Sequence, residues 1–266
     1  MTHRLGIIGA GNMGGAIVHG CIRSNVFPAR EMMVADVDAS KLDGLRELGV
    51  EVTQNASLAA RAPNVILADK PQAFGDVGKM IAPLRESKLV ISIMAGLGSR
   101  AIRAALGQSA RVIRVMPNMP CQIGAGMSAI ALGDGAHPGD EALAVSIFGA
   151  LGRTVMVDES LMYAVTAVSG SGPAYVFLLA EAMEQAAVTL GIDPAVAKTL
   201  VDQTVFGAGK LLIESGTKAV ELRRSVTSPG GTTAAALEVF EQRRFVDAVI
   251  AALTAARDRG RQLDRQ

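Results

Sequence analysis

Two glycine-rich segments of this 266-residue chain carry residue types suited to binding anions. Residues 228–233 read Ser-Pro-Gly-Gly-Thr-Thr and are followed by an apolar run of strong helix formers. Proline restricts φ to about −65° and glycine allows backbone shapes closed to other residues, so the segment predicts a tight turn before a helix. The free N–H groups of the first helical turn, the helix dipole and two hydroxyls would hold a small anion such as a carboxylate. An ordinary N-capped helix explains one threonine and one glycine but not the whole block.

The second segment, residues 9–14, reads Gly-Ala-Gly-Asn-Met-Gly between a predicted strand at 4–8 and a predicted helix. This pattern in a strand–turn–helix context is typical of dinucleotide binding. Gly9 allows the turn, Gly11 lets a pyrophosphate approach the backbone, and Gly14 lets the helix pack on the strand. The alternative is a glycine-rich turn that binds no ligand.

Asp36 ends the second predicted strand, residues 32–35. An acidic residue at this place accepts hydrogen bonds from the adenosine ribose hydroxyls and repels a 2′-phosphate. The sequence therefore favours NADH over NADPH, although Lys41 could still reach a phosphate. The structural alternative is that Asp36 begins a turn and that Ser40 caps the next helix, predicted at 41–48.

Strands and helices continue to alternate, which predicts a doubly wound parallel sheet of the Rossmann type. In such sheets ligands lie beyond the carboxyl ends of the strands, where Lys70 and the stiff loop with Pro117 fall. Lys70 would neutralise a cofactor phosphate or face the substrate; the alternative is a solvated loop cation. The remaining predicted strands are 50–53, 64–68, 89–93, 111–115, 127–132 and 154–157, with a helix at 138–151.

From residue 160 onward the pattern is helical. Residues 174–190 are apolar on nearly all faces, which predicts burial, and the rest of the C-terminal half is too small to cover them alone. We therefore expect a partner chain. The predicted domains are 1–158, which binds the dinucleotide, and 159–266, which is helical. The other predicted helices are 161–168, 194–212, 232–242 and 245 to about 260, with a solvated or frayed tail at 257–266.

Composition excludes several function classes. The net charge of +1 gives no reason to expect a nucleic acid or an anionic membrane surface as partner. Cys21 and Cys121 lie outside metal-ligand spacing, so we expect no metal, and we interpret both as buried hydrophobes in a reducing cytoplasm. The chain has no run of about 18 uninterrupted apolar residues, so we expect no membrane span.

The reactions that this chain can catalyse are limited by how few side chains could act as a general base. None of the three histidines lies in a motif, whereas oxidation of an alcohol needs a base, most often His or Lys. A cyclic imine takes its proton from water at moderate pH, and the iminium then accepts a hydride with little help. The enzyme has only to orient the partners, anchor a carboxylate and exclude water. Thr233 is placed to hydrogen-bond the ring nitrogen.

Several motifs now coincide with one family. The segments GAGNMG, KPQ, RVMPN, AVTAVSGSGPAY and VTSPGGTT occur in this order, and the chain resembles pyrroline-5-carboxylate reductase over nearly its whole length. The resemblance implies reduction of 1-pyrroline-5-carboxylate to L-proline, the last step of proline biosynthesis, with NADPH or NADH. It also implies a cytoplasmic homo-oligomer in which the helical domain interlocks with a second subunit, with dimers sometimes assembled into decamers.

The resemblance also implies site residues. Thr233 and Glu159 match the positions expected to act on the substrate, Glu159 from the junction of the domains. The substrate-binding residues implied are Glu159, Ser228, Gly230, Gly231, Thr232 and Thr233. The cofactor-binding residues expected are Gly9, Ala10, Gly11, Asn12, Met13, Gly14, Asp36, Asn55, Asp69, Lys70, Pro71, Ala95, Gly96, Pro117, Asn118 and Ser225.

The chain departs from the family pattern at four places. Asp69 replaces a valine and adds an anion near the phosphates, and Met94 replaces a small residue beside the nicotinamide loop. Lys218-Ala219 stands where His-Pro is usual, and Arg223-Arg224 stands where a basic residue is followed by Asp. These departures bear on cofactor preference and turnover more than on the reaction class.

Two other functions remain open at this stage. A β-hydroxyacid dehydrogenase also joins a Rossmann domain to a helical one and would use a helix lysine, Lys198 or Lys210, as acid and base. That reading leaves residues 228–233 without a role. A nucleotide-sensing protein without turnover is the other alternative, and it rests on Asp69 and Met94.

Overall fold

The computed structural model describes residues 3–84 and 86–263, which form two compact units. Unit 1 comprises the residues up to 171 together with those from 255 onward, and unit 2 comprises 172–254. The tail predicted to be solvated or frayed is helical as far as Leu263, because it packs with unit 1; residues 264–266 lie outside the described residues. The predicted domain boundary between 158 and 159 stays a prediction.

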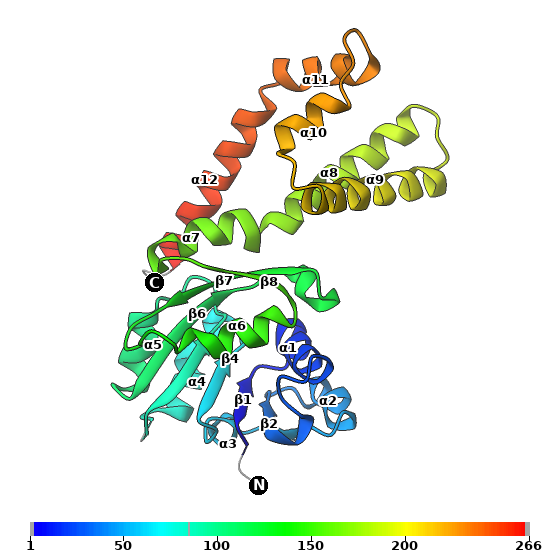
Figure 1. Cartoon of the computed structure of the whole chain (residues 1–266). Coiled ribbons are helices and arrows are strands. Elements are labelled where there is room, and N and C mark those ends of the chain that lie inside the picture. The colour runs from blue at the N-terminus through cyan, green and yellow to red at the C-terminus, as the bar shows by residue number, and fades with distance from the viewer. Residues whose placement is uncertain (1–2, 85, 264–266) are drawn as a thin grey trace. The chain divides into compact units, whose positions relative to one another are not determined.

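Unit 1 is built on an eight-stranded sheet with the order β3-β2-β1-β4-β5-β6-β7-β8 (Figure 1). All neighbouring strands are parallel except β6 and β7, which are antiparallel. A short 3-10 turn joins these two strands and leaves no room for a crossover helix, so the chain must reverse. The doubly wound sheet is thus confirmed with one antiparallel pair. The strands are β1 Leu5–Ile8, β2 Met32–Ala35, β3 Glu51–Thr53, β4 Asn64–Leu67, β5 Lys88–Ser92, β6 Ala110–Met116, β7 Gly126–Leu132 and β8 Gly152–Met156.

The side chains of these strands alternate between two hydrophobic clusters, one on each face of the sheet. Leu5 and Ile7 of β1 join the cluster that contains α1, α2 and α6, whereas Ile8 joins the cluster of α3, α4 and α5. This follows from the two-residue period of a strand. The helices of these two layers are α1 Asn12–Arg23, α2 Asp43–Glu47, α3 Ala56–Ala59, α4 Phe74–Ile81, α5 Ser99–Leu106 and α6 Glu141–Gly149.

Short helical turns connect these elements. The helix predicted at 41–48 is split between a 3-10 turn and α2. The helix predicted at 161–168 is a succession of a 3-10 turn, α7 and a π-helical turn. These elements are η1 Ala29–Glu31, η2 Ala39–Lys41, η3 Pro71–Ala73, η4 Met119–Ile123, η5 Glu159–Leu161, α7 Met162–Val165 and the π-helical η6 Thr166–Gly170.

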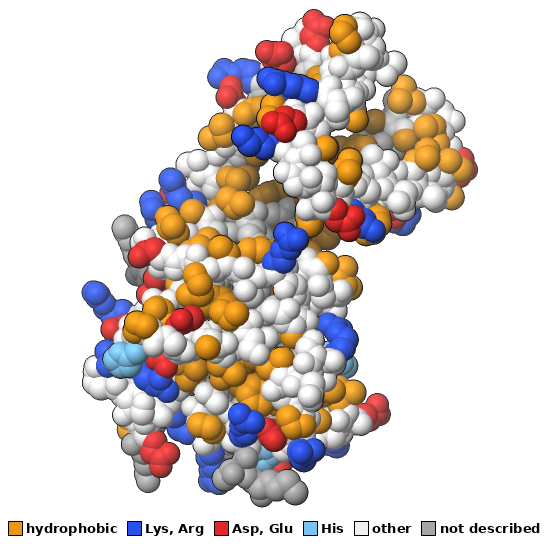
Figure 2. Space-filling model, viewed as in Figure 1, with side chains coloured by type: hydrophobic (Ala, Val, Ile, Leu, Met, Phe, Trp, Pro, Cys, Tyr) orange, Lys and Arg blue, Asp and Glu red, His pale blue; other side chains and the backbone are white. Residues whose placement is uncertain are grey.

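Unit 2 is helical, as predicted, and its apolar side chains are largely exposed in a single chain. Leu178 and Phe206 are 65% and 62% exposed, and hydrophobic side chains gather on the surface of these helices (Figure 2). By length and composition alone, the helical stretch Glu159–Thr189 is apolar enough to cross a membrane. The helices are α8 Gly172–Thr189, α9 Pro194–Glu214, α10 Ala219–Ser225, α11 Thr232–Gln242 and α12 Phe245–Leu263, whose last residues belong to unit 1.

Candidate functional site

The turn after β1 has the geometry that its glycines predict. Gly9 has a φ of +107°, a conformation that L side chains rarely adopt. A side chain on Gly14 would collide with the carbonyl oxygen of Gly9, so only glycine lets α1 begin this close to the strand. A Cβ built on Gly11 would have none of the protein's other described atoms within 4 Å. The backbone at Gly11 is therefore free for the approach of a ligand, and α1 directs its N-terminus at that space.

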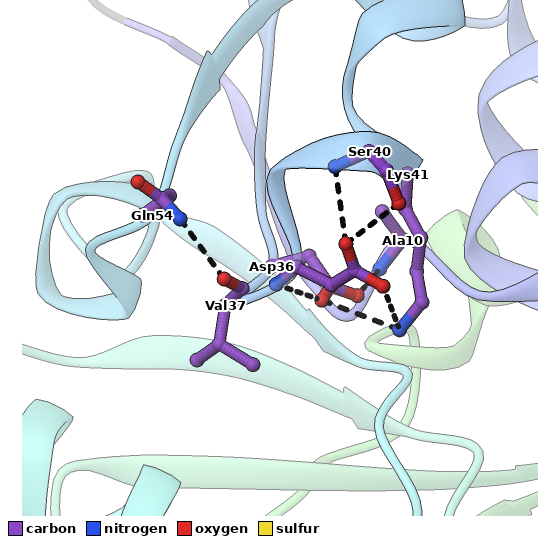
Figure 3. A network of polar contacts seen from close by, with 7 residues as sticks. Ala10, Asp36, Val37, Ser40, Lys41 and Gln54 are labelled. Carbon is purple, nitrogen blue, oxygen red and sulfur yellow. Dashed lines mark hydrogen bonds and ion pairs between the residues drawn. The ribbon is translucent and has the colours of Figure 1, made fainter.

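Asp36 lies beside this turn at the carboxyl end of β2. Its Oδ2 accepts a hydrogen bond from the backbone N of Ala10 at 2.8 Å, and its Oδ1 accepts one from the N of Asp38 at 2.9 Å. The Nζ of Lys41 lies 3.4 Å from the same Oδ1 (Figure 3). The carboxylate is 6% exposed, yet it is compensated by these three donors. Asp36 thus joins the dinucleotide turn to the segment after β2.

A groove of about 710 Å³ extends from the turn along α1. Gly11 and Gly15 line it near the helix N-terminus, and His19 and Arg23 line it further along the same helix face. Lys41, which follows β2, also lines it. The groove therefore joins the dinucleotide turn to a cationic stretch suited to the phosphates of a nucleotide.

The loop after β4 carries Asp69, Lys70 and Pro71. Burial raises the pKa of Asp69, and the carboxylate of Asp36 raises it further, while Lys41 acts in the opposite sense. Lys70 is exposed and makes no ion pair with any described residue, so its ammonium is available to a ligand. Pro71 begins the 3-10 turn η3. The loop thus places one carboxylate and one unpaired cation at the end of the same strand.

The loops after β5 and β6 carry the other predicted cofactor residues of unit 1. Gly96 has a φ of +72°, and Ala95 packs against a small cluster that includes Met116. The side-chain amide of Asn118 is engaged within the protein: its Oδ1 accepts from the N of Met127 at 2.9 Å. Pro117 is buried. These residues shape the two loops rather than present free side chains.

Met94 lies directly before Ala95 and Gly96, and its side chain points into the core. The residue is 2% exposed and belongs to the same hydrophobic cluster as α3, α4 and α5. Its thioether can fill an irregular gap there, and its effect on cofactor preference or turnover stays a prediction.

Two predicted cofactor residues make local hydrogen bonds, and one of them caps a helix. The Oδ1 of Asn55 accepts hydrogen bonds from the N and Oγ of Ser57, at 2.9 and 2.7 Å, and so begins α3. The Oγ of Ser225 donates to the carbonyl of Leu222 at 2.7 Å. Both residues have an intramolecular role, and their part in cofactor binding stays a prediction.

In unit 2, residues 228–233 form the turn that their sequence predicts. The N of Gly231 donates to the carbonyl of Ser228 at 3.0 Å, and Gly230 has a φ of +68°, which with proline before it is typical of a type II turn. A side chain on Gly231 would collide with the Oγ of Ser228. Helix α11 then begins at Thr232, with Gly231 as N-cap. It has neither a capping side chain nor an acidic residue in its first turn, so its N–H donors are open.

Glu159 is held by unit 1. Its Oε1 accepts from the N of Ser99 at 2.9 Å and its Oε2 from the Oγ of Ser99 at 2.6 Å. The Nη1 of the buried Arg114 lies 3.4 Å from Oε1. The carboxylate therefore caps α5 and neutralises Arg114. Both oxygens have partners, which makes Glu159 a structural anchor in this chain; its contact with substrate stays a prediction.

The two lysines nominated for a hydroxyacid dehydrogenase are ion-paired on α9. Lys198 Nζ lies 2.6 Å from Asp202, and the hydrogen bond to this carboxylate raises the pKa of Lys198. Lys210 Nζ lies 3.8 Å from Glu214. A general base needs a pKa near the working pH, so the raised pKa of Lys198 disfavours that role.

Three residues near these sites were missed from sequence. His19 and Arg23 line the groove because they follow Gly11 and Gly15 at four-residue steps, a spacing that would have identified this helix face. Arg114 gives no such signal, because it lies within an apolar strand and its partner is 45 residues away.

Comparison with known proteins agrees with these features. Residues 4–96 match the family model "NADP oxidoreductase coenzyme F420-dependent", and residues 159–263 match "Pyrroline-5-carboxylate reductase dimerisation". The fold and the nucleotide turn thus define an NAD(P)-linked oxidoreductase with a helical dimerisation domain.

Relatives identify the family. A pyrroline-5-carboxylate reductase of Methanosarcina acetivorans is 40% identical over 100% of this chain and 99% of its own length. The solved pyrroline-5-carboxylate reductase of Coxiella burnetii is 36% identical, covers 100% of both chains and has a TM-score of 0.91. That of Plasmodium falciparum, solved with NADP bound, is 29% identical over 98% of both chains, with a TM-score of 0.88. The chain belongs to the pyrroline-5-carboxylate reductase family: it is an NAD(P)H-dependent reductase that forms L-proline from 1-pyrroline-5-carboxylate.

Proposed function

We propose that this chain carries out the reaction of its family with the N-terminus of α11 as the carboxylate site and the β1–α1 turn as the dinucleotide site. The observation that carries the proposal is the uncapped first turn of α11, which follows the Pro229-Gly230 turn. Its N–H donors and the hydroxyls of Thr232 and Thr233 suit a carboxylate. Ser228 and Gly231 hold the turn in shape.

The chemical step needs little from the protein besides position. Bound NADH or NADPH supplies the hydride, and the substrate iminium accepts it at the C=N carbon while water has already supplied the proton on nitrogen. Anchoring the carboxylate orients the ring, and Thr233 hydrogen-bonds the ring nitrogen. Exclusion of water around the two reactants protects the hydride.

Substitution of Thr233 tests this site. Thr233→Ala removes a hydrogen bond to a charged ligand, so we expect kcat/KM for 1-pyrroline-5-carboxylate to fall by about one to two powers of ten, mainly through KM. Thr204→Ala is the matched control, because Thr204 is an exposed threonine of the same unit whose hydroxyl is bonded to the carbonyl of Leu200. An unchanged KM for Thr233→Ala in an assay of cofactor oxidation would remove the pocket from the account.

The preferred cofactor in this proposal is NADH. Asp36 ends β2 beside the β1–α1 turn, where its carboxylate would accept from a ribose 2′-hydroxyl and repel a 2′-phosphate, while Lys41 would offset part of that repulsion. Asp36→Ser should shift the ratio of kcat/KM values toward NADPH by about tenfold. Asp36→Glu, which keeps the charge, should leave NADH preferred. Equal ratios in the wild type and the serine variant would show that Asp36 does not set the preference.

The proposed assembly is a homodimer formed through unit 2, and such dimers could associate into a decamer. We place this assembly in the cytoplasm, with no membrane as partner. The exposed apolar side chains of α8 and α9 support it, because a second copy would remove them from water. The buried thiols Cys21 and Cys121 suit a reducing compartment.

A further inference from the structure

We propose that Gly260 and Leu263, in the last turn of α12, position the loop after β5. This inference rests on the proposed function and on the expectation that Ala95 and Gly96 of that loop bind the cofactor. It concerns residues at the far end of the chain that neither the motifs nor the charge pattern pointed to. The contacts that carry it all lie within unit 1.

The loop and the helix approach each other at a pair of glycines. A Cβ built on Gly96 would lie 3.1 Å from the Cβ of Leu263 and 3.8 Å from the carbonyl oxygen of Gly260. A Cβ built on Gly260 would lie 3.3 Å from Cδ1 of Tyr163. The two carbon–carbon distances, to Leu263 and to Tyr163, are shorter than an ordinary contact. A larger residue in place of either glycine would therefore force the helix end and its neighbours apart.

The same loop is fixed on its other sides by unit 1 itself. Ser99, which begins α5 directly after the loop, is bonded through both its N and its Oγ to Glu159. Arg114 pairs with Glu159, and its guanidinium lies 5.9 Å from the ring centre of Tyr163. The ring of Tyr163 thus lies between this buried network and Gly260. The last turn of α12 completes the enclosure of Gly96.

The consequence for function is specific. A loop with a left-handed residue such as Gly96 has several accessible shapes, and the helix end restricts it to one. Releasing the contact should weaken dinucleotide binding, because the ordering of the loop would then have to accompany binding. It should leave the carboxylate turn on α11 unchanged.

Gly260→Val tests this by placing a branched side chain against Tyr163. We expect Kd and KM for NADH to rise about five- to tenfold, with KM for 1-pyrroline-5-carboxylate and kcat each within about twofold of the wild type. Gly260→Ala should give a smaller rise in the same direction. Gln262→Val is the matched control, since it adds the same side chain in the same turn at an exposed residue.

The possible results separate the inference from the function on which it rests. If Gly260→Val lowers kcat alone, or lowers the thermal midpoint with KM for NADH unchanged, the contact is merely structural and the inference is wrong. The same holds if Gln262→Val raises KM for NADH equally. Failure of the wild type to bind NADH or to form proline would instead overturn the proposed function.

Discussion

Asp36 shows how one carboxylate organises the dinucleotide turn before any cofactor is bound. Its two oxygens accept from the backbone N of Ala10 and of Asp38, so it links the turn after β1 to the segment after β2. These hydrogen bonds compensate the burial of the carboxylate. The residue chosen from the sequence for cofactor specificity is therefore also part of the fold.

Asp69 is the residue at which pH should matter. Its pKa is raised above the ordinary value of 3.8, first by burial and then by Asp36. The charged form of Asp69 is thus less favourable in the folded chain than in the unfolded one. The free energy of unfolding therefore falls as pH rises from 3.8 through the raised pKa of the folded chain, and the full loss is present above that pKa. Asp69→Asn should raise the urea midpoint at pH 7, and the gain over the wild type should vanish below pH 3.8.

The same substitution should strengthen cofactor binding if Asp69 lies near the phosphates, as the family resemblance implies, because it removes a negative charge. We expect the Kd for NADH at pH 7 to fall by about two- to fivefold at low salt, with a smaller change at high salt. Asp76→Asn is a suitable control, since Asp76 is an exposed aspartate of the following helix. An identical Kd for wild type and Asp69→Asn would place Asp69 away from the phosphates.

At the scale of single residues, the sequence predicted the turn conformations, because these depend on the local backbone. Gly9 and Gly230 have the positive φ that their motifs require, and Pro229 begins the turn before α11. The partners of Glu159 were not predictable in this way. Ser99 lies 60 residues from it in the chain, and only the sheet topology brings the two together.

Among the elements, strands were predicted best. Each predicted strand is present with its ends shifted by at most two residues. The strands at the centre of the sheet have apolar runs buried on both faces, whereas β3 and β8 at its edges are partly exposed. The direction of β7 and the helical tail were not predicted. The former depends on the short connection after β6, and the latter on packing of Gly260 against Tyr163, which charge composition does not reveal.

The pairing of Glu159 with α5 gives a prediction at this scale. Glu159→Ala would leave the buried guanidinium of Arg114 without its carboxylate and α5 without its cap. We expect the free energy of unfolding to fall by about 2–3 kcal/mol, measured by urea denaturation. If Glu159 instead mainly contacts substrate, stability would be kept and KM for 1-pyrroline-5-carboxylate would rise.

For the whole molecule, the main feature is the apolar surface of unit 2. The sequence predicted that the helix at 174–190 is apolar on nearly all faces and that a partner chain helps to bury it. In the single chain none of the residues of α8 is buried, which agrees with that expectation. The family model for this region describes dimerisation, so a partner chain is the natural cover.

Phe206→Glu tests the proposed dimer. Phe206 is 62% exposed on α9, and a charge there would have to be buried in an interface that uses this face. We expect the dissociation constant of the dimer to rise on the order of a hundredfold, measured by light scattering over a dilution series. Lys198→Glu, a charge change at an exposed polar residue of the same helix, is the control. Dimers of equal strength in both variants would place the interface elsewhere.

The central claim is that a carboxylate binds at the N-terminus of α11 while the dinucleotide occupies the β1–α1 turn. The most direct measurement is a crystal structure of the protein with L-proline and oxidised cofactor. We predict that the proline carboxylate accepts hydrogen bonds from the backbone N–H groups of Thr232 and Thr233, with the pyrophosphate beside Gly11. A structure in which proline binds well away from residues 230–233 would contradict the account.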